Sequence, residues 1–127
     1  MLLFSSVFLA GCGVGYIVCL VVLFYPFLNN PFNDEKFNQA VWLQYHKSDD
    51  WNNPRGKMAE DLKKKILKAK MSRQEVLNML GPPDFREEKV LLSYDLGMWS
   101  GFRIDGDSFD VYFDSSDHVE EILIVQH

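Results

Sequence analysis

Residues 1–28 form an apolar N-terminal segment that contains no charged side chain. A helix rises about 1.5 Å per residue, so more than about 20 such residues can cross the hydrocarbon core of a bilayer. Pro26, Asn29, Asn30 and Pro31 would end this helix where water begins. We therefore expect a transmembrane anchor at residues 1–28, which confines the rest of the chain to a small domain held beside a membrane.

Two other interpretations of this segment stay open. Leu9-Ala10-Gly11-Cys12 resembles the bacterial lipobox, in which the cysteine becomes the lipid-carrying first residue, so Cys12 is a candidate lipidation site. A cleaved secretory signal is the third interpretation. The segment lacks the positively charged n-region of a signal peptide, and the residues after Cys12 stay apolar. Both features favour the permanent anchor.

The remaining residues, 29–127, are enough for one domain with a modest core. We divide them into a linker with a short amphipathic helix at 29–54 and an α+β domain at 55–127. Both cysteines, Cys12 and Cys19, lie in the apolar segment. The sequence after residue 28 therefore offers no disulfide framework, no thiolate nucleophile and no cysteine-based zinc site.

Apolar spacing predicts three helices in this part of the chain. The first begins at Asn33 or Asp34 and has an aromatic face made of Phe37, Val41, Trp42 and Tyr45. The second has one apolar stripe opposite its lysines, made of Met58, Leu62, Ile66, Leu67 and Ala69. The third starts with the capping box Ser72 to Glu75 and ends at Gly81, where a left-handed residue is needed before the following prolines.

Three strands are expected after the helices. Alternating apolar residues predict strands at 89–96, 108–113 and 119–125, and the polar turn 114–117 joins the last two as a hairpin. Strands that follow helices as a group indicate an α+β fold. We expect two helices packed on one face of a three-stranded antiparallel sheet, preceded by the anchor and the short extra helix.

Three motifs in this order resemble the SmpA/OmlA lipoprotein family, the BamE-like group. Residues 71–84, MSRQEVLNMLGPPD, are similar to its S-x-x-E-V-x-x-x-L-G-x-P signature. Residues 92–97, LSYDLG, resemble its Y-x-L-G strand, and residues 111–119 resemble its V-x-F-D-x-x-x-x-V hairpin. The resemblance implies a fold shared with the β-lactamase inhibitor protein, a domain on the periplasmic or extracellular side of the cell membrane, and non-catalytic protein binding.

The sequence shows no recognisable catalytic or metal site. His46, His118 and His127 do not stand at metal-ligand spacing, and no phosphate-binding loop or nucleophile elbow occurs. Asp105 and Asp107 with Asp110 are interrupted by apolar residues, so a polar strand connection is favoured over a calcium loop. We therefore expect no enzyme activity, no cofactor, no bound metal and no small-molecule substrate.

Charge is unevenly distributed along the chain. Residues 55–73 carry eight basic and two acidic side chains, whereas residues 84–127 carry three basic and eleven acidic ones. A basic helix beside a membrane can contact anionic headgroups, which makes candidate lipid-binding residues of Lys57, Lys63, Lys64 and Lys68. The alternative is a solvated helix face. The net charge of −5 argues against a nucleic-acid partner.

Residues 97–103 form the strongest candidate for partner contact. This loop combines two glycines with residue types that are enriched at protein interfaces, namely Met98, Trp99, Phe102 and Arg103. The alternative is that Trp99 and Phe102 pack onto the small core. Together these features predict a membrane-anchored protein-binding domain of the bacterial cell envelope, with an expected role as an envelope or outer-membrane assembly accessory factor. An inhibitor or immunity-type protein that blocks an enzyme or toxin is the other hypothesis.

Overall fold

The computed structural model describes residues 30–100 and 105–127. The expected anchor at 1–28, the lipidation candidate Cys12, and the loop residues Phe102 and Arg103 lie outside the described residues. Within the described part, the chain has no helix that is both long and apolar enough to cross a membrane.

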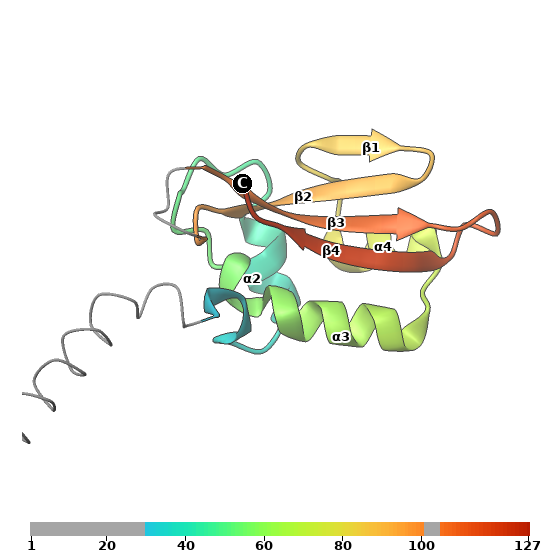
Figure 1. The fold of residues 1–127 in the computed structure, drawn as a ribbon, viewed down its shortest axis with the longest axis horizontal. Coiled ribbons are helices and arrows are strands. Elements are labelled where there is room, and N and C mark those ends of the chain that lie inside the picture. The colour runs from blue at the N-terminus through green and yellow to red at the C-terminus, as the bar shows by residue number, and fades with distance from the viewer. Residues whose placement is uncertain (1–29, 101–104) are drawn as a thin grey trace, which may run out of the picture.

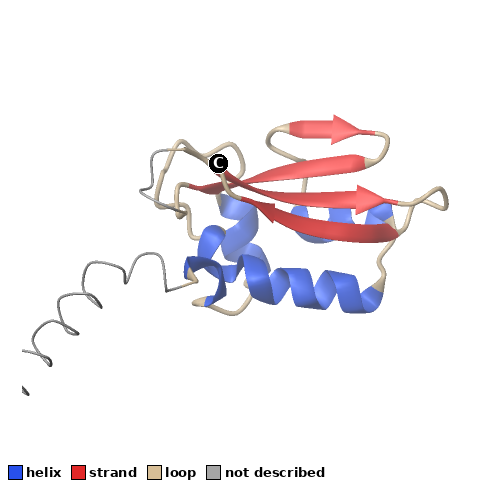
Figure 2. Cartoon of the chain, in the orientation of Figure 1, coloured by secondary structure: helices blue, strands red, loops and turns tan. Residues whose placement is uncertain are grey.

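The described chain folds as two layers, an antiparallel sheet and a layer of helices beneath it (Figure 1). The sheet order is β1-β2-β3-β4, with bounds Arg86–Glu88, Leu91–Gly97, Asp107–Phe113 and Val119–Val125. Figure 2 shows the helices gathered on one face of the sheet: α2 (Gln39–Gln44), α3 (Ala59–Ala69) and α4 (Arg73–Leu80). The expected α+β class is confirmed.

The sheet has four strands, so the prediction of a three-stranded sheet is wrong. The extra strand, β1, pairs with β2 through the register Arg86↔Ser93 to Glu88↔Leu91. All three of its side chains are exposed, so no apolar alternation marks it in the sequence. Its hairpin turn occupies residues 89 and 90, which is why β2 begins at Leu91 rather than at residue 89.

The core lies between the sheet and the helices, with Trp42 of α2 near its centre. Trp42 is fully buried, and its ring lies 5.9 Å from the ring centroids of both Tyr94 and Phe109. Its indole Nε1 donates to the Leu80 carbonyl at 3.1 Å, which satisfies an oxygen at the end of α4. One side chain therefore connects α2, α4 and both central strands.

Two helix boundaries test the sequence signals directly. The Ser72 hydroxyl accepts from the Glu75 amide at 3.2 Å, and Gly81 has a φ of +74°, so the predicted cap and stop of α4 are confirmed. The predicted start of α2 is wrong, because Asn38 caps it by accepting from the Val41 amide at 3.2 Å. Asn33 instead ends a 3-10 turn, Pro31–Asn33.

Helix α3 buries a narrower stripe than its sequence suggests. Leu62 and Ile66 are fully buried, but Leu67 is 43% exposed and Ala69 is also exposed. The inclusion of these two residues in the buried stripe is therefore wrong. The sheet covers only one side of the helix, and Leu67 falls on the flank that it leaves open.

We predict that Leu62→Ala lowers the free energy of unfolding by about 2–5 kcal/mol, because it leaves a cavity in the core. The matched control on the same helix, Leu67→Ala, should change it by about 0.5 kcal/mol or less. Urea denaturation of the full chain in a neutral detergent measures both. Equal losses for the two variants would contradict the burial described here.

Candidate functional site

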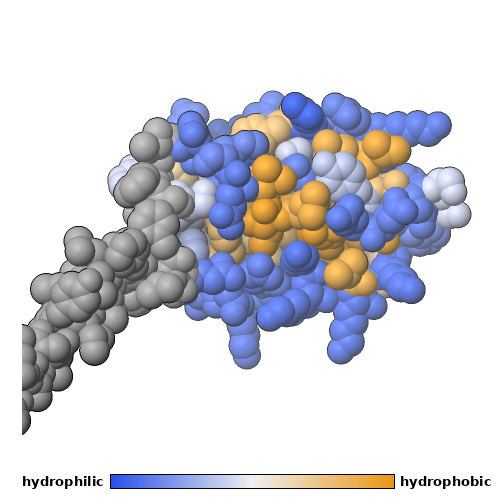
Figure 3. Space-filling model, viewed as in Figure 1, coloured by the Kyte–Doolittle hydropathy of each residue, from blue (hydrophilic) through white to orange (hydrophobic). Residues whose placement is uncertain are grey.

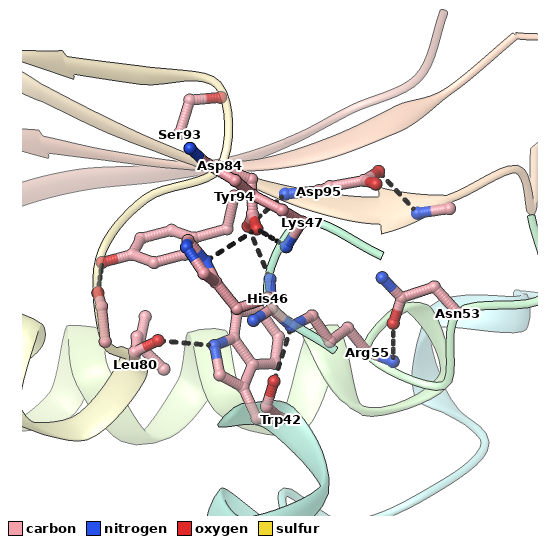
Figure 4. A network of polar contacts seen from close by, with 12 residues as sticks. Trp42, His46, Lys47, Asn53, Arg55, Leu80, Asp84, Ser93, Tyr94 and Asp95 are labelled. Atoms are coloured by element: carbon pink, nitrogen blue, oxygen red, sulfur yellow. Dashed lines mark hydrogen bonds and ion pairs between the residues drawn. The ribbon is translucent and has the colours of Figure 1, made fainter. Parts of the chain in front are cut away.

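Asp84 is a buried carboxylate on which several segments of the chain converge (Figure 4). Its Oδ2 accepts from Arg55 Nη1 at 2.5 Å and from the Asp95 amide at 3.1 Å. Its Oδ1 accepts from the Lys47 amide at 2.6 Å and lies 3.0 Å from His46 Nδ1, a contact that is an ion pair only while the imidazole is protonated. Asp84 thus joins the 46–55 loop to the α4–β1 turn and to β2.

Arg55 is the buried partner of Asp84 and is fully excluded from solvent. Its Nε donates to the Trp42 carbonyl at 2.7 Å, and its guanidinium lies 4.6 Å from the centroid of the Trp42 ring. Burial lowers the pKa of Arg55, and the Asp84 carboxylate opposes that change. Removing one member of such a pair costs about 3–5 kcal/mol, since the other charge stays buried without its counterion.

A groove of about 250 Å³ is formed by the segments that Asp84 joins, and its lining includes Phe85, which follows Asp84, and Asp95, whose amide donates to Asp84. It is lined by the loop 48–51, by Phe85, by the end of β2 and by Gly106 at the start of β3. Phe85 is 57% exposed, the largest value among the large apolar side chains of the described residues, and Trp51 is 50% exposed. Aromatic surface beside a concavity is typical of a contact site rather than of a core.

The groove is held open by backbone contacts between distant segments. The Met98 amide donates to the Trp51 carbonyl at 2.9 Å, and the Phe85 amide donates to the Ser93 carbonyl at 3.1 Å. Gly97 has a φ of +86°, and a Cβ at this position would lie 2.8 Å from the Trp51 carbonyl oxygen. Only glycine allows β2 to approach the loop so closely without strain.

The polar lining of the groove is acidic. Asp49, Asp50 and Asp95 contribute carboxylates, and none of the lining residues within 30–100 and 105–127 is basic. Burial raises the pKa of Asp95. The Gly97 amide donates to Asp95 Oδ1 at 2.9 Å and opposes this rise, whereas the nearby Asp84 charge adds to it. The groove therefore combines three acidic side chains with two aromatic ones, Trp51 and Phe85.

The structure divides the predicted contact loop. Met98 lines the groove. Trp99 is partly buried against the core, with its indole Nε1 donating to the Asn53 carbonyl at 2.8 Å and its amide donating to Asp107 Oδ2 at 2.7 Å. Sequence reasoning missed Trp51 and Phe85, although an aromatic residue inside the polar 46–54 loop is a signal that could have identified the first.

The acidic cluster considered for calcium is largely internal. Asp107 is fully buried and accepts from the Trp99 and Ser100 amides and from the Ser100 hydroxyl, while Asp110 pairs with the Ser93 hydroxyl. Across residues 30–100 and 105–127, no group of three or more His, Cys, Asp and Glu side chains is placed to hold a metal ion.

The candidate lipid-binding lysines occupy the helix layer. Lys64 and Lys68 are exposed on α3, Lys63 is partly exposed, and none of these three forms an ion pair with another described residue. Lys57 differs, because its Nζ lies 5.5 Å from the centroid of the Trp99 ring. The structure therefore groups three of the four lysines on one helix.

A larger concavity of about 780 Å³ lies at the opposite end of the sheet, around Arg73. Arg73 Nε donates to Asp117 Oδ1 at 2.9 Å, its other nitrogens donate to the Glu88 and Lys89 carbonyls, and its guanidinium lies 4.4 Å from the Phe113 ring centroid. Through these contacts, Arg73 at the start of α4 binds both the β1–β2 turn and the β3–β4 turn. Its lining mixes basic and acidic side chains, so it selects no ligand charge.

The apolar surface that faces the viewer in Figure 3 lies over β4 and α3, where the exposed apolar residues are Leu123 and Leu67.

Comparisons with protein-family models, with curated proteins and with solved structures gave no match. The resemblance to the SmpA/OmlA family therefore stays a prediction from the motifs.

We predict that Gly97→Ala distorts the groove and lowers the free energy of unfolding by about 1–3 kcal/mol, because alanine at this φ is strained and meets the Trp51 carbonyl. The control is Gly106→Ala, since a Cβ on this lining residue would have no atom within 4 Å. Urea denaturation and the NMR shift of the Met98 amide measure both effects. An unchanged Met98 shift in Gly97→Ala would refute the close approach.

Proposed function

We propose that this chain is a non-catalytic protein-binding domain of the bacterial cell envelope, linked to the membrane by residues 1–28, with a role as an envelope or outer-membrane assembly accessory factor. The observation that carries the proposal is the groove lined by Trp51 and Phe85, whose flanking segments are joined by Asp84 and its partner Arg55. Aromatic residues and methionine are enriched at protein contacts, and rigid support makes such a site selective.

The size of the groove supports a protein partner over a small-molecule substrate. Small-molecule sites usually occupy about 300–1,000 Å³ and enclose most of their ligand. The groove between Trp51 and Phe85 has about 250 Å³ and lies at the surface, which is room for one large side chain of a partner. Its exposed aromatic walls would supply the rest of the contact area.

The lysines of α3 support a location beside an anionic bilayer. The turn Pro31–Asn33, with which the described chain begins, packs against α3 and the following turn Gly56–Met58. The described chain thus begins beside the basic helix. In this proposal Lys63, Lys64 and Lys68 contact anionic headgroups, each contributing about 1 kcal/mol near the surface.

An inhibitor or immunity-type protein is the second candidate function, and the acidic lining of the groove favours it. Such a domain could complement a basic surface on an enzyme or toxin. The carboxylates available for this purpose are Asp49, Asp50 and Asp95, because Asp107 and Asp110 are buried. The identity of the bound partner separates the two functions.

We predict that a benzophenone side chain in place of Phe85 forms a discrete protein adduct when intact cells are irradiated. The full chain is used, and Ser115, an exposed residue in the β3–β4 turn at the other end of the sheet, is the control position. The adduct should disappear when Gly97→Ala is added to the Phe85 probe. The absence of a Phe85 adduct, or equal adducts at Phe85 and Ser115, would contradict the proposed function.

A further inference from the structure

We propose that the groove and the sheet face that carries it bind a positively charged segment of the partner, with an Arg or Lys side chain between Trp51 and Phe85. This inference rests on the proposed function and names the chemistry of its partner. It is carried by three observations: the lining of the groove, the side chains on the helix-free sheet face, and the position of the lysines.

The groove combines aromatic walls with carboxylates in a way that suits a cation. Trp51 and Phe85 present about half of their surface to solvent, and Asp49, Asp50 and Asp95 line the same groove. A guanidinium or ammonium group can stack on an aromatic face while it pairs with a carboxylate. An anionic side chain would meet three like charges, and the described part of the lining offers it no basic side chain.

The strand register extends the acidic surface beyond the groove. Side chains alternate between the two faces of a sheet, and the helices bury the face of Leu92, Tyr94 and Phe109. The opposite face holds the rows Arg86–Ser93–Asp110–Leu123, Glu88–Leu91–Tyr112–Glu121 and Asp95–Ser108–Val125. Asp110 is buried on this face, but Glu88 and Glu121 are exposed and Asp95 is partly exposed, against the single base Arg86. The face that continues from the groove therefore also favours a cationic partner.

The basic residues lie on the other layer. Lys63, Lys64 and Lys68 belong to α3, which packs on the face of the sheet that Leu92 and Tyr94 share. Negative charge therefore gathers on the helix-free face and positive charge on the helix layer. The helix-free face repels an anionic bilayer, and the helix layer attracts one. The occupant that fits the groove is therefore a basic protein segment.

The experiment uses the full chain, isotope-labelled, in micelles of a neutral detergent. Three short peptides of equal length are titrated into the protein. Leucine alternates with arginine in the first peptide, with serine in the second and with glutamate in the third. NMR shifts of the Gly97 and Gly106 amides and of the Trp51 indole report binding in the groove. We expect only the arginine peptide to shift these signals, and we expect added salt to weaken the binding of this peptide.

The matched variants test whether the carboxylates select the partner. Asp49→Asn combined with Asp95→Asn keeps the side-chain oxygen that accepts from Gly97 and removes two charges, so the arginine peptide should bind about tenfold more weakly. Glu120→Gln removes an exposed charge outside the groove and should leave binding unchanged. Equal binding of the serine or glutamate peptide, no shift with the arginine peptide, or no effect of the double variant would overturn the inference.

The Phe85 crosslink separates this inference from the function on which it rests. A Phe85 adduct that is unchanged by Asp49→Asn and Asp95→Asn would mean that a partner occupies the groove without the proposed charge pairing. That result overturns the charged partner and leaves the binding function intact. An adduct that is lost in the double variant and kept in Glu120→Gln supports both.

Discussion

The buried ion pair between Arg55 and Asp84 is the interaction on which the rest of this end of the molecule depends. It lies where the 46–55 loop, the turn after α4 and strand β2 meet. Desolvating two charges is costly, and the Trp42 carbonyl and the backbone amides that bind the pair offset part of that cost. The pair therefore fixes geometry more than it adds stability.

This geometry explains how a small domain can present a groove. Asp84 fixes the backbone immediately before Phe85 and immediately around Asp95, while the loop that it holds carries Trp51. Gly97 then allows β2 and the loop to come into contact. The walls of the groove are thus set by backbone positions, and the Trp51 and Phe85 side chains on these walls are about half exposed.

Local signals in the sequence predicted local structure well. The Ser72 cap, the Gly81 stop and the buried stripe through Leu62 and Ile66 depend on neighbours within a few residues, and all are confirmed. Strand β1 was missed because its three exposed side chains are held by backbone pairing with β2, which leaves no pattern in the sequence.

The groove could not be read from the sequence for a related reason. It requires Trp51, Phe85 and Met98 to meet, and these residues stand far apart in the chain. The predicted contact loop supplied only Met98 to the groove, because Trp99 finds its hydrogen-bond acceptor in the Asn53 carbonyl and packs partly on the core. Tertiary contacts of this kind decide which aromatic side chains face solvent.

Hydrogen exchange in Asp84→Asn, measured residue by residue on the full chain, tests the central role of the ion pair most directly. We predict that the amides of Lys47, Asp95 and Met98 lose protection, because the first two donate to Asp84 and the third depends on the loop that Asp84 holds. The amide of Ile66 in α3 should stay protected. Full protection of Met98 in this variant would show that the groove forms without the pair and would contradict the account.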